Sequence, residues 1–204
     1  MNCMESSGNS NNNNASNITG VSLPLVLGAA TVGSERSIDF VPVSDSDTVN
    51  KVRNLNSVLF PVRYSAGFYK SLTQPGQFAQ LAKYQGTCVG TIACRKQALG
   101  QADPVTSVYD PRIPQPELCE MYMLTLGVLA PYRRLGIGRM LLSNALDAAK
   151  QDPLVKRIVL HVKIDNDDAL RFYHKHGFST LRLIERYYKN IDPPHAYLLE
   201  LRIR

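Results

Sequence analysis

The chain has 204 residues, of which 44% are hydrophobic and 20% are charged, and its formal net charge at pH 7 is +6. This length predicts one domain with a substantial core rather than two full domains. The mild positive charge suits an anionic ligand or an acidic partner. Lysines and arginines that merely solvate a surface would give the same balance, so charge alone assigns no function.

Neither the cysteines nor the apolar runs indicate secretion, metal binding or membrane insertion. The four cysteines are too scattered for a C-x-x-C pair, and we expect reduced thiols and no metal site. The apolar run Val21–Val32 lacks a preceding basic segment and is too short to span a bilayer. We therefore expect a soluble, intracellular protein of the cytoplasm, with nuclear entry left open and no membrane association.

Residues 1–36 are rich in Asn and Ser, including the run Asn11–Asn14, and contain few aromatic or charged residues. Such a stretch buries too little apolar surface to offset the entropy lost on ordering. We expect a disordered extension with a local turn or strand around Val21–Leu27, followed by one folded domain over 37–204.

The first part of this domain alternates between strand and helix patterns. The run Ile38–Val43 is typical of a strand, and the Ser and Asp residues after it can cap a helix whose apolar side chains recur at helical spacing over 48–59. Pro61 ends that helix. It leaves an apolar and aromatic loop, Phe60–Tyr64, that either packs on its own domain or lines a pocket.

A second short helix is predicted over 68–73, before a Pro-Gly turn. Strands over 79–84 and 88–95 surround the turn Gln85–Gly86 and predict a hairpin. Residues 97–117 contain four prolines and no helical period, so we expect a long proline-rich loop there.

The next stretch reads as a strand that runs directly into an anion-binding turn. The apolar run Met121–Leu129 predicts a buried strand, and Arg133, Gly136 and Gly138 follow in R-x-x-G-x-G spacing at the start of a helix over 137–150. Glycines let the backbone approach a ligand, and the free amides of a helix start attract anions such as a pyrophosphate. The glycines alone fit an ordinary strand–turn–helix connection equally well, and neither the P-loop nor the dinucleotide-binding motif matches.

A second strand-to-helix unit follows: a strand over 157–163, then a helix that ends at Gly177. Two such units in succession predict neighbouring parallel strands. Strands over 178–184 and 196–203 complete a mixed sheet with helices on both faces.

Histidine is the side chain best suited to accept a proton from an amine near neutral pH. His161 lies inside an apolar strand, and Tyr122 lies near the start of the other central strand, so their polar tips converge if the strands are neighbours. A core histidine that merely satisfies its hydrogen bonds is the simpler interpretation of His161 alone. We expect His174, His176 and His195 at the surface.

The run Arg133–Gly138 resembles the acetyl-CoA signature Q/R-x-x-G-x-G/A of the GNAT acetyltransferases, and TLGVLAPYRRLGIG is similar to the N-terminal acetyltransferases of the NatE (San) type. Further similar motifs are FPVRY, YMLTLG, LHV, FY-x-x-x-GF and YYKNIDP, in the same order along the chain. The resemblance implies an α/β GNAT fold, a single domain whose central mixed, mostly antiparallel sheet is flanked by helices on both faces. The long loop 97–117 departs from the family as an insertion, and Leu124 stands where the family commonly has Met.

The resemblance also implies roles for individual residues. Tyr122 and His161 would be the general bases, acting through ordered water, and a backbone amide near Leu126 would serve the oxyanion. The implied acetyl-CoA contacts are Leu126, Gly127, Val128, Arg133, Arg134, Leu135, Gly136, Ile137, Gly138, Asn166 and Tyr173, of which Tyr173 would also protonate the leaving thiolate. The implied peptide-binding residues are Phe60, Pro61, Val62, Tyr64, Leu124, Tyr187, Tyr188 and Ile191.

The implied function is transfer of an acetyl group from acetyl-CoA to the α-amino group of protein N-termini that retain the initiator Met, such as Met-Leu, by direct attack. The implied partners are N-terminal peptides, the auxiliary and catalytic subunits of NatA and, through them, the ribosome; no direct nucleic-acid site is evident. Two alternatives remain open. A lysine ε-amine acetyltransferase is disfavoured by the apolar groove walls, and a weakly active acetyl-CoA-binding scaffold of a NatA complex is disfavoured by the presence of both Tyr122 and His161.

Overall fold

The computed structural model describes residues 37–102 and 118–203. The expected disordered extension, the local strand around Val21–Leu27 and most of the proline-rich loop lie outside these ranges. Within them, no helix is long and apolar enough to cross a membrane.

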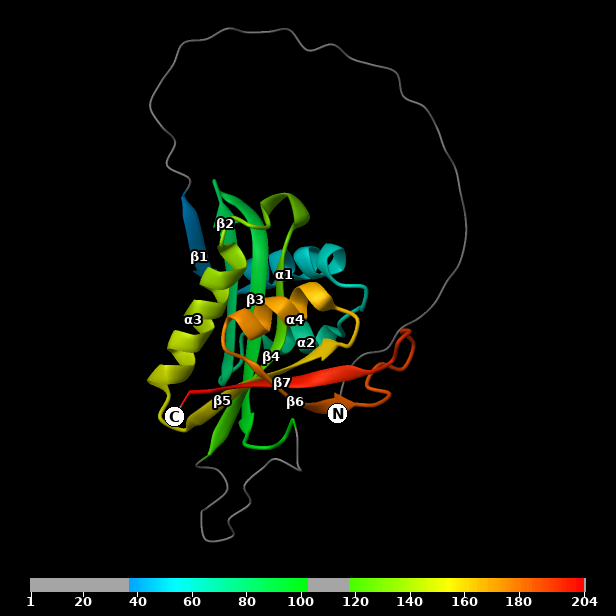
Figure 1. The fold of residues 1–204 in the computed structure, drawn as a ribbon. Coiled ribbons are helices and arrows are strands. Elements are labelled where there is room, and N and C mark those ends of the chain that lie inside the picture. Colours follow the sequence, from blue (N-terminus) through cyan, green and yellow to red (C-terminus); the bar gives the residue numbers. More distant parts are fainter. Residues whose placement is uncertain (1–36, 103–117, 204) are drawn as a thin grey trace, which may run out of the picture.

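Seven strands form one sheet in the order β1-β2-β3-β4-β5-β7-β6 (Figure 1). All neighbouring pairs are antiparallel except β4 and β5, which are parallel, so the predicted mixed, mostly antiparallel sheet is confirmed. The strands are β1 (Ile38–Pro42), β2 (Gln77–Tyr84), β3 (Thr87–Ala98), β4 (Cys119–Val128), β5 (Val155–Lys163), β6 (Ser179–Ile184) and β7 (Ala196–Arg202).

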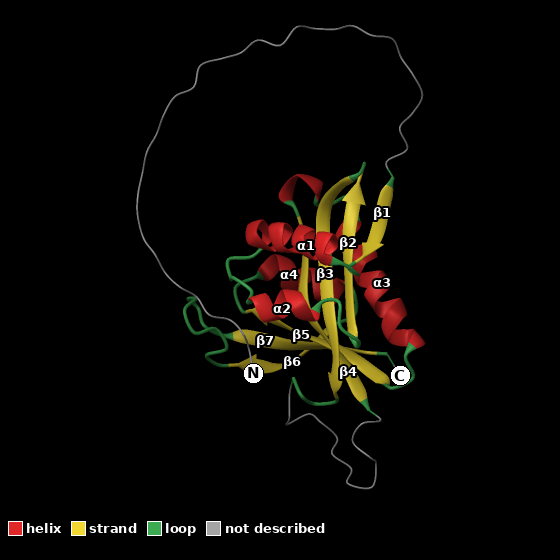
Figure 2. Cartoon of the chain, turned by 180° about the vertical axis from the view of Figure 1, so that it is seen from behind, coloured by secondary structure: helices red, strands yellow, loops and turns green. Residues whose placement is uncertain are grey.

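Helices cover both faces of the sheet, and Figures 1 and 2 view the two faces in turn. The helices are α1 (Ser46–Leu59), α2 (Ala66–Ser71), α3 (Ile137–Gln151) and α4 (Asp167–Lys175), with a short 3-10 turn, η2, at Ala130–Tyr132. Two buried clusters separate along β3: Ile92 and Cys94 pack with residues of α3 and α4, whereas Ala93 packs with residues of α1 and α2. Because successive strand residues point to opposite faces, the two clusters are cores on opposite sides of the sheet.

Local sequence explains where the helices begin and end. The Asp45 side chain accepts a hydrogen bond from the Thr48 amide at 2.8 Å, and the Asp45 amide donates to Thr48 Oγ1 at 3.1 Å, which forms a capping box for α1. The helix ends at Leu59, two residues before Pro61. Asn166 caps α4, and Gly177, at a φ of +87°, follows its end.

Several strand boundaries differ from the prediction by one to three residues, and two of these differences involve charged or polar positions. β3 continues through Ala98, so residues 97 and 98 are not part of the loop, and β5 begins at Val155 rather than 157. In both places polar side chains interrupt the apolar pattern. Arg157 nevertheless lies inside the sheet because it forms ion pairs there.

The pairing of β4 is irregular where the site forms. A register shift against β3 leaves Leu124 as an extra residue between the pairs Cys94–Met123 and Ala93–Thr125. On its other side, β4 pairs with β5 only up to Tyr122 opposite Val159. A bulge bends and twists the strand that carries it. β4 and β5 therefore part immediately after Tyr122.

Candidate active site

The parting of β4 and β5 leaves an open strand edge in the middle of the sheet. Residues 123–128 of β4 pair with β3, and β5 pairs with β7 up to Lys163, but no pair joins these stretches of β4 and β5 among the described strands. An open edge offers backbone hydrogen-bonding groups to an extended ligand. The predicted residues Leu126, Gly127 and Val128 all lie along it.

A tyrosine and a histidine meet where the strands part. Tyr122 Oη on β4 lies 2.9 Å from His161 Nδ1 on β5, and it also lies 2.9 Å from Tyr187 Oη in the connection between β6 and β7. The Tyr187 ring stacks on the imidazole of His161, with a centroid distance of 4.3 Å and an interplanar angle of 16°. The predicted convergence of Tyr122 and His161 is confirmed, and Tyr187 joins them.

The electrostatics of this cluster favour neutral phenols. Burial, reinforced by the neighbouring Tyr187, raises the pKa of Tyr122 well above its ordinary value. Burial also raises the pKa of Tyr188 to about 12. Both hydroxyls are therefore protonated near neutral pH. Within the cluster, the imidazole of His161 is the group able to accept a proton there.

Two aromatic segments hold most of the other predicted peptide-binding residues: the loop after α1 and the β6–β7 connection. Burial, and then the electrostatic influence of Tyr188, raises the pKa of Tyr64. Phe60 packs edge-on against Tyr64 with ring centroids 6.0 Å apart, and Tyr187 packs edge-on against Tyr188 at 4.9 Å. The other predicted peptide-binding residues, Val62, Leu124 and Ile191, are partly buried, whereas Pro61 is exposed.

Gly127 allows the loop after α1 to approach β4. A Cβ built on Gly127 would lie 2.9 Å from Leu59 Cδ1 and 3.1 Å from Phe60 Cζ, which is too close for either contact to remain unchanged. The glycine therefore sets how near the Phe60 loop comes to the open strand edge.

The start of α3 has the features of an anion site. Gly136 adopts a φ of +81°, and no side chain caps the helix. The first turn carries no acidic residue, and Met140 N donates to Gly136 O, so the amides of the residues between them have no partner within the helix. Arg133 and Arg134 are exposed beside this end, and Arg133 Nε donates to Val128 O at 3.1 Å.

Gly138 is not required by packing. A Cβ at this position would meet Phe172 and Val128 at 3.8 Å, which is ordinary contact. A glycine in a first helical turn is destabilising by roughly 0.5–1 kcal/mol relative to alanine. The absence of a side chain at Gly138 lets a ligand come close to the backbone. Two other predicted acetyl-CoA contacts differ from each other in exposure: Leu135 is exposed, and Ile137 is buried.

The two predicted residues from α4 lie apart from the tyrosine cluster. Tyr173 is buried in the core between the sheet and α3, and its hydroxyl lies 3.5 Å from Met123 Sδ, while burial strongly raises its pKa. Asn166 Oδ1 accepts a hydrogen bond from Ala169 N at 3.1 Å, so this side chain caps α4. Both belong to α4 or its cap, which follows the open end of β5.

The remaining histidines are less uniform than predicted. His174 is exposed, with Nε2 lying 3.1 Å from Thr180 Oγ1, as expected for a surface residue. His176 and His195 are partly buried, and each makes a local hydrogen bond. His176 Nδ1 lies 2.7 Å from Phe172 O, and His195 Nδ1 accepts a hydrogen bond from the Arg186 amide at 3.3 Å. None of the three approaches the tyrosine cluster in a contact recorded for the described residues.

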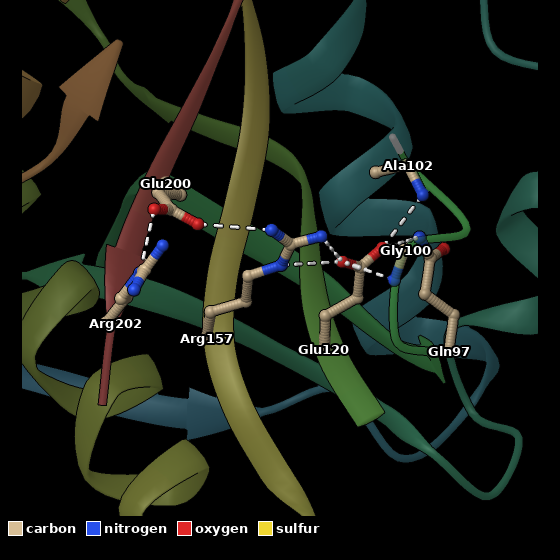
Figure 3. A network of polar contacts seen from close by, with 7 residues as sticks. All are labelled: Gln97, Gly100, Ala102, Glu120, Arg157, Glu200 and Arg202. Carbon is tan, nitrogen blue, oxygen red and sulfur yellow. Dashed lines mark hydrogen bonds and ion pairs between the residues drawn. The ribbon is translucent and has the colours of Figure 1, made fainter. Parts of the chain in front are cut away.

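Sequence reasoning missed a buried ionic network near the site (Figure 3). It joins Glu120, Arg157 and Glu200, three charged residues embedded in strand patterns. The available signal was a charged residue directly before an apolar run: Glu120 precedes Met121, and Arg157 precedes Ile158–Leu160. Among residues 37–102 and 118–203, no group of three or more His, Cys, Asp or Glu side chains could hold a metal ion.

Comparison with known proteins finds relatives along most of the domain. The family model described as acetyltransferase (GNAT) family matches residues 49–178. The N-alpha-acetyltransferase 50 of Danio rerio is 37% identical over 156 residues, which cover 76% of this chain and 83% of that protein. The probable N-acetyltransferase san of Drosophila melanogaster is 35% identical over 156 residues, covering 76% of each chain.

A solved structure is also similar to this chain. The structure of Arabidopsis thaliana Naa50 in complex with the bisubstrate analogue CoA-Ac-MVNAL matches with a TM-score of 0.69 and 36% identity, and the match covers 81% of this chain and 98% of that chain. The similarity therefore extends over nearly all of the described domain, including the strands that part at the site.

Proposed function

The chain belongs to the acetyltransferase (GNAT) family, and we propose that it is an N-alpha-acetyltransferase that transfers the acetyl group of acetyl-CoA to the α-amino group of a protein N-terminus. The observation that carries the proposal is the contact between Tyr122 and His161 at the point where β4 and β5 part. The names of its relatives and the CoA-containing Arabidopsis complex support the reaction class.

Acetyl-CoA supplies an acetyl group already activated as a thioester. The start of α3 fits its pyrophosphate, because free amides from Ile137 onward and the cationic Arg133 and Arg134 surround a backbone that carries no side chain at Gly138. The open edge of β4 along Leu126–Val128 fits the acetyl and pantetheine arm, with a backbone amide near Leu126 serving the oxyanion.

Proton removal is assigned to Tyr122 and His161. An α-amino group must lose a proton to attack, and Tyr122 cannot act as a free phenolate because burial raises its pKa. Tyr122 therefore takes a proton from the amine, directly or through a water, while it passes its own proton to His161 Nδ1 at 2.9 Å. The attack is direct: Cys119 is buried in the core, and no base pairs with it among the described contacts.

The acceptor is assigned to the residues of the two aromatic segments and of β4. The apolar side chains of Phe60, Val62, Leu124 and Ile191 suit an unbranched side chain such as that of an initiator methionine. The hydroxyls of Tyr64 and Tyr188 are protonated and can donate to the peptide backbone. The analogue in the Arabidopsis complex, which carries the sequence MVNAL, supports a methionine at the first position.

The test measures acetyl-CoA consumption by the full chain with three peptides: one beginning Met-Leu, one beginning Ser-Glu, and one with a blocked N-terminus and an internal lysine. We expect turnover on the Met-Leu peptide, with little on the others. Turnover that survives the blocked N-terminus would support the lysine alternative. Binding of acetyl-CoA without turnover on any peptide would support the scaffold alternative.

We further propose that the chain works in the cytoplasm with the catalytic and auxiliary subunits of NatA and, through them, at the ribosome. The support is the resemblance of its motifs to the NatE type. The test is co-sedimentation of the full chain with ribosomes in cell extract before and after removal of the NatA auxiliary subunit. Sedimentation that is unchanged by this removal, or no sedimentation at all, would contradict it.

A further inference from the structure

A buried ionic network lies on the sheet face that carries Tyr122 and His161, with Arg157 of β5 at its centre (Figure 3). Arg157 Nε donates to Glu120 Oε2 of β4 at 3.0 Å, and Arg157 Nη1 donates to Glu200 Oε2 of β7 at 3.1 Å. Glu120 is 0%, Glu200 5% and Arg157 6% exposed. The network therefore joins three neighbouring strands away from solvent.

The carboxylates of this network have further partners that hold them in place. Glu120 Oε1 accepts from Gln97 Nε2 and from the Ala102 amide, each at 2.8 Å, and Glu120 Oε2 accepts from the Gly100 amide at 3.2 Å. Glu200 Oε1 accepts from Arg202 Nε at 3.0 Å. Buried charges with several hydrogen-bond partners are rigid, because any movement leaves a desolvated group unpaired.

The network sits at the short stretch where β4 and β5 are in register. Four pairs join the two strands: Cys119 with Val155 and, beyond a register shift, three consecutive pairs that begin with Glu120 opposite Arg157 and end with Tyr122 opposite Val159. The described strands part after the last pair. Parallel pairing is slightly less stable per residue than antiparallel pairing, so these few pairs fix the placement of β4 against β5 only weakly.

We propose that Arg157 is a positioning residue, which fixes β4 against β5 through Glu120 and Glu200 and thereby holds the Tyr122 hydroxyl against His161 Nδ1. Tyr122 follows Glu120 by two residues and His161 follows Arg157 by four. Tyr122 therefore lies on the same sheet face as Glu120, and His161 lies on the same face as Arg157. A slip of one strand against the other would separate Tyr122 from His161. The catalytic part of this inference rests on the proposed function.

The matched test compares Arg157→Lys with Arg157→Met and with two controls. Lysine keeps the charge but cannot donate from separate nitrogens in a fixed fork to both carboxylates. Arg202→Ala removes only the exposed outer arm of the network, and Leu81→Ala opens a cavity in the core at β2, a strand that pairs with β1 and β3. Thermal unfolding of each variant establishes that the assayed protein is folded.

We expect kcat to fall about tenfold or more in Arg157→Lys, with the KM values for peptide and acetyl-CoA within about twofold, because small displacements of catalytic groups are costly. Arg202→Ala and Leu81→Ala should keep kcat within about threefold. A fall in Arg157→Lys of less than threefold, or one that Leu81→Ala shares, would overturn the proposal.

A second readout does not depend on turnover. Nitrogen NMR of the His161 ring, assigned with a His161→Gln variant, reports the hydrogen bond at Nδ1. We expect Arg157→Lys and Arg157→Met to move the Nδ1 signal toward its position in Tyr122→Phe, and Leu81→Ala to leave it unchanged. An unchanged Nδ1 signal in both Arg157 variants would refute positioning even if the wild-type chain acetylated no peptide, an outcome that would refute the proposed function separately.

Discussion

Replacement of Tyr122 by phenylalanine removes one oxygen atom and tests the proposed proton path. That oxygen lies 2.9 Å from His161 Nδ1 and 2.9 Å from Tyr187 Oη. A net contribution of about 0.5–1.5 kcal/mol for each hydrogen bond gives a loss in unfolding free energy of about 1–3 kcal/mol, which should leave the chain folded. General-base catalysis contributes about 100-fold or more to a rate, so kcat should fall at least about 100-fold, which corresponds to about 2.7 kcal/mol of activation free energy.

The assay is steady-state acetylation of the Met-Leu peptide at saturating acetyl-CoA, with unfolding in urea measured on the same preparations. Tyr197→Phe is the matched control, because Tyr197 packs against the core on the opposite side of the sheet. The KM for acetyl-CoA should change little in Tyr122→Phe, since Tyr122 precedes the open edge of β4. A kcat within about threefold of wild type would refute the assignment of Tyr122 to proton removal.

Three further predictions follow from the same geometry. Gly138→Ala should raise the unfolding free energy by about 0.5–1 kcal/mol, because the added Cβ meets no protein atom closer than 3.8 Å. The same Cβ faces the proposed pyrophosphate, so the KM for acetyl-CoA should rise at least about fivefold. Urea unfolding checks the first effect, and acetyl-CoA titration checks the second. Asn166→Ala should lower the thermal stability by about 1 kcal/mol through loss of the α4 cap, as calorimetry would show. Alkaline pH should destabilise the chain. Burial raises the pKa of Cys94 above its ordinary value of about 9, that of Tyr188 from 10.0 to about 12, and that of Tyr122, so from about pH 9 upward the unfolded chain loses protons that the folded chain keeps. The unfolding free energy should therefore fall above about pH 9 in denaturant titrations.

Most of the fold could be predicted because its elements carry local patterns. Ile137–Gln151 has apolar residues at helical spacing, and the strands that flank Gln85–Gly86 meet at a turn in which Gly86 adopts a positive φ without strain. The convergence of Tyr122 and His161 also followed from local reasoning, since two successive strand-to-helix units place their strands side by side. These features depend on neighbours in sequence.

The features that escaped prediction depend on contacts between distant residues. Arg157 was predicted at the start of a strand, but its burial inside β5 between Glu120 and Glu200, 37 and 43 residues away, was not. The contact of Tyr187 with Tyr122 spans 65 residues. The bulge at Leu124 depends on its register against β3, which no alternation within β4 records. The family resemblance predicted Leu124 and Tyr187 as peptide-binding residues and the apolar pattern predicted Arg157 as the start of a strand, but the contacts that these residues make depend on tertiary pairing.

Tyr122, the proposed base, and Tyr173, the acid that the family resemblance implies, lie on opposite sides of β4, and this placement constrains the direction of the reaction. Tyr122 and Met123 are adjacent on β4 and therefore point to opposite faces. Tyr122 contacts His161 and Tyr187 on one face, whereas Tyr173 contacts Met123 on the other. An amine that delivers its proton to Tyr122 would thus approach the acetyl group from the side of His161 and Tyr187. A thiolate that took a proton from Tyr173, the acid that the family resemblance implies, would leave toward α4, and burial, which raises the pKa of that phenol, makes the transfer uphill. The open edge of β4 between them is where the acetyl group must lie for both transfers to occur without rotation of the substrate.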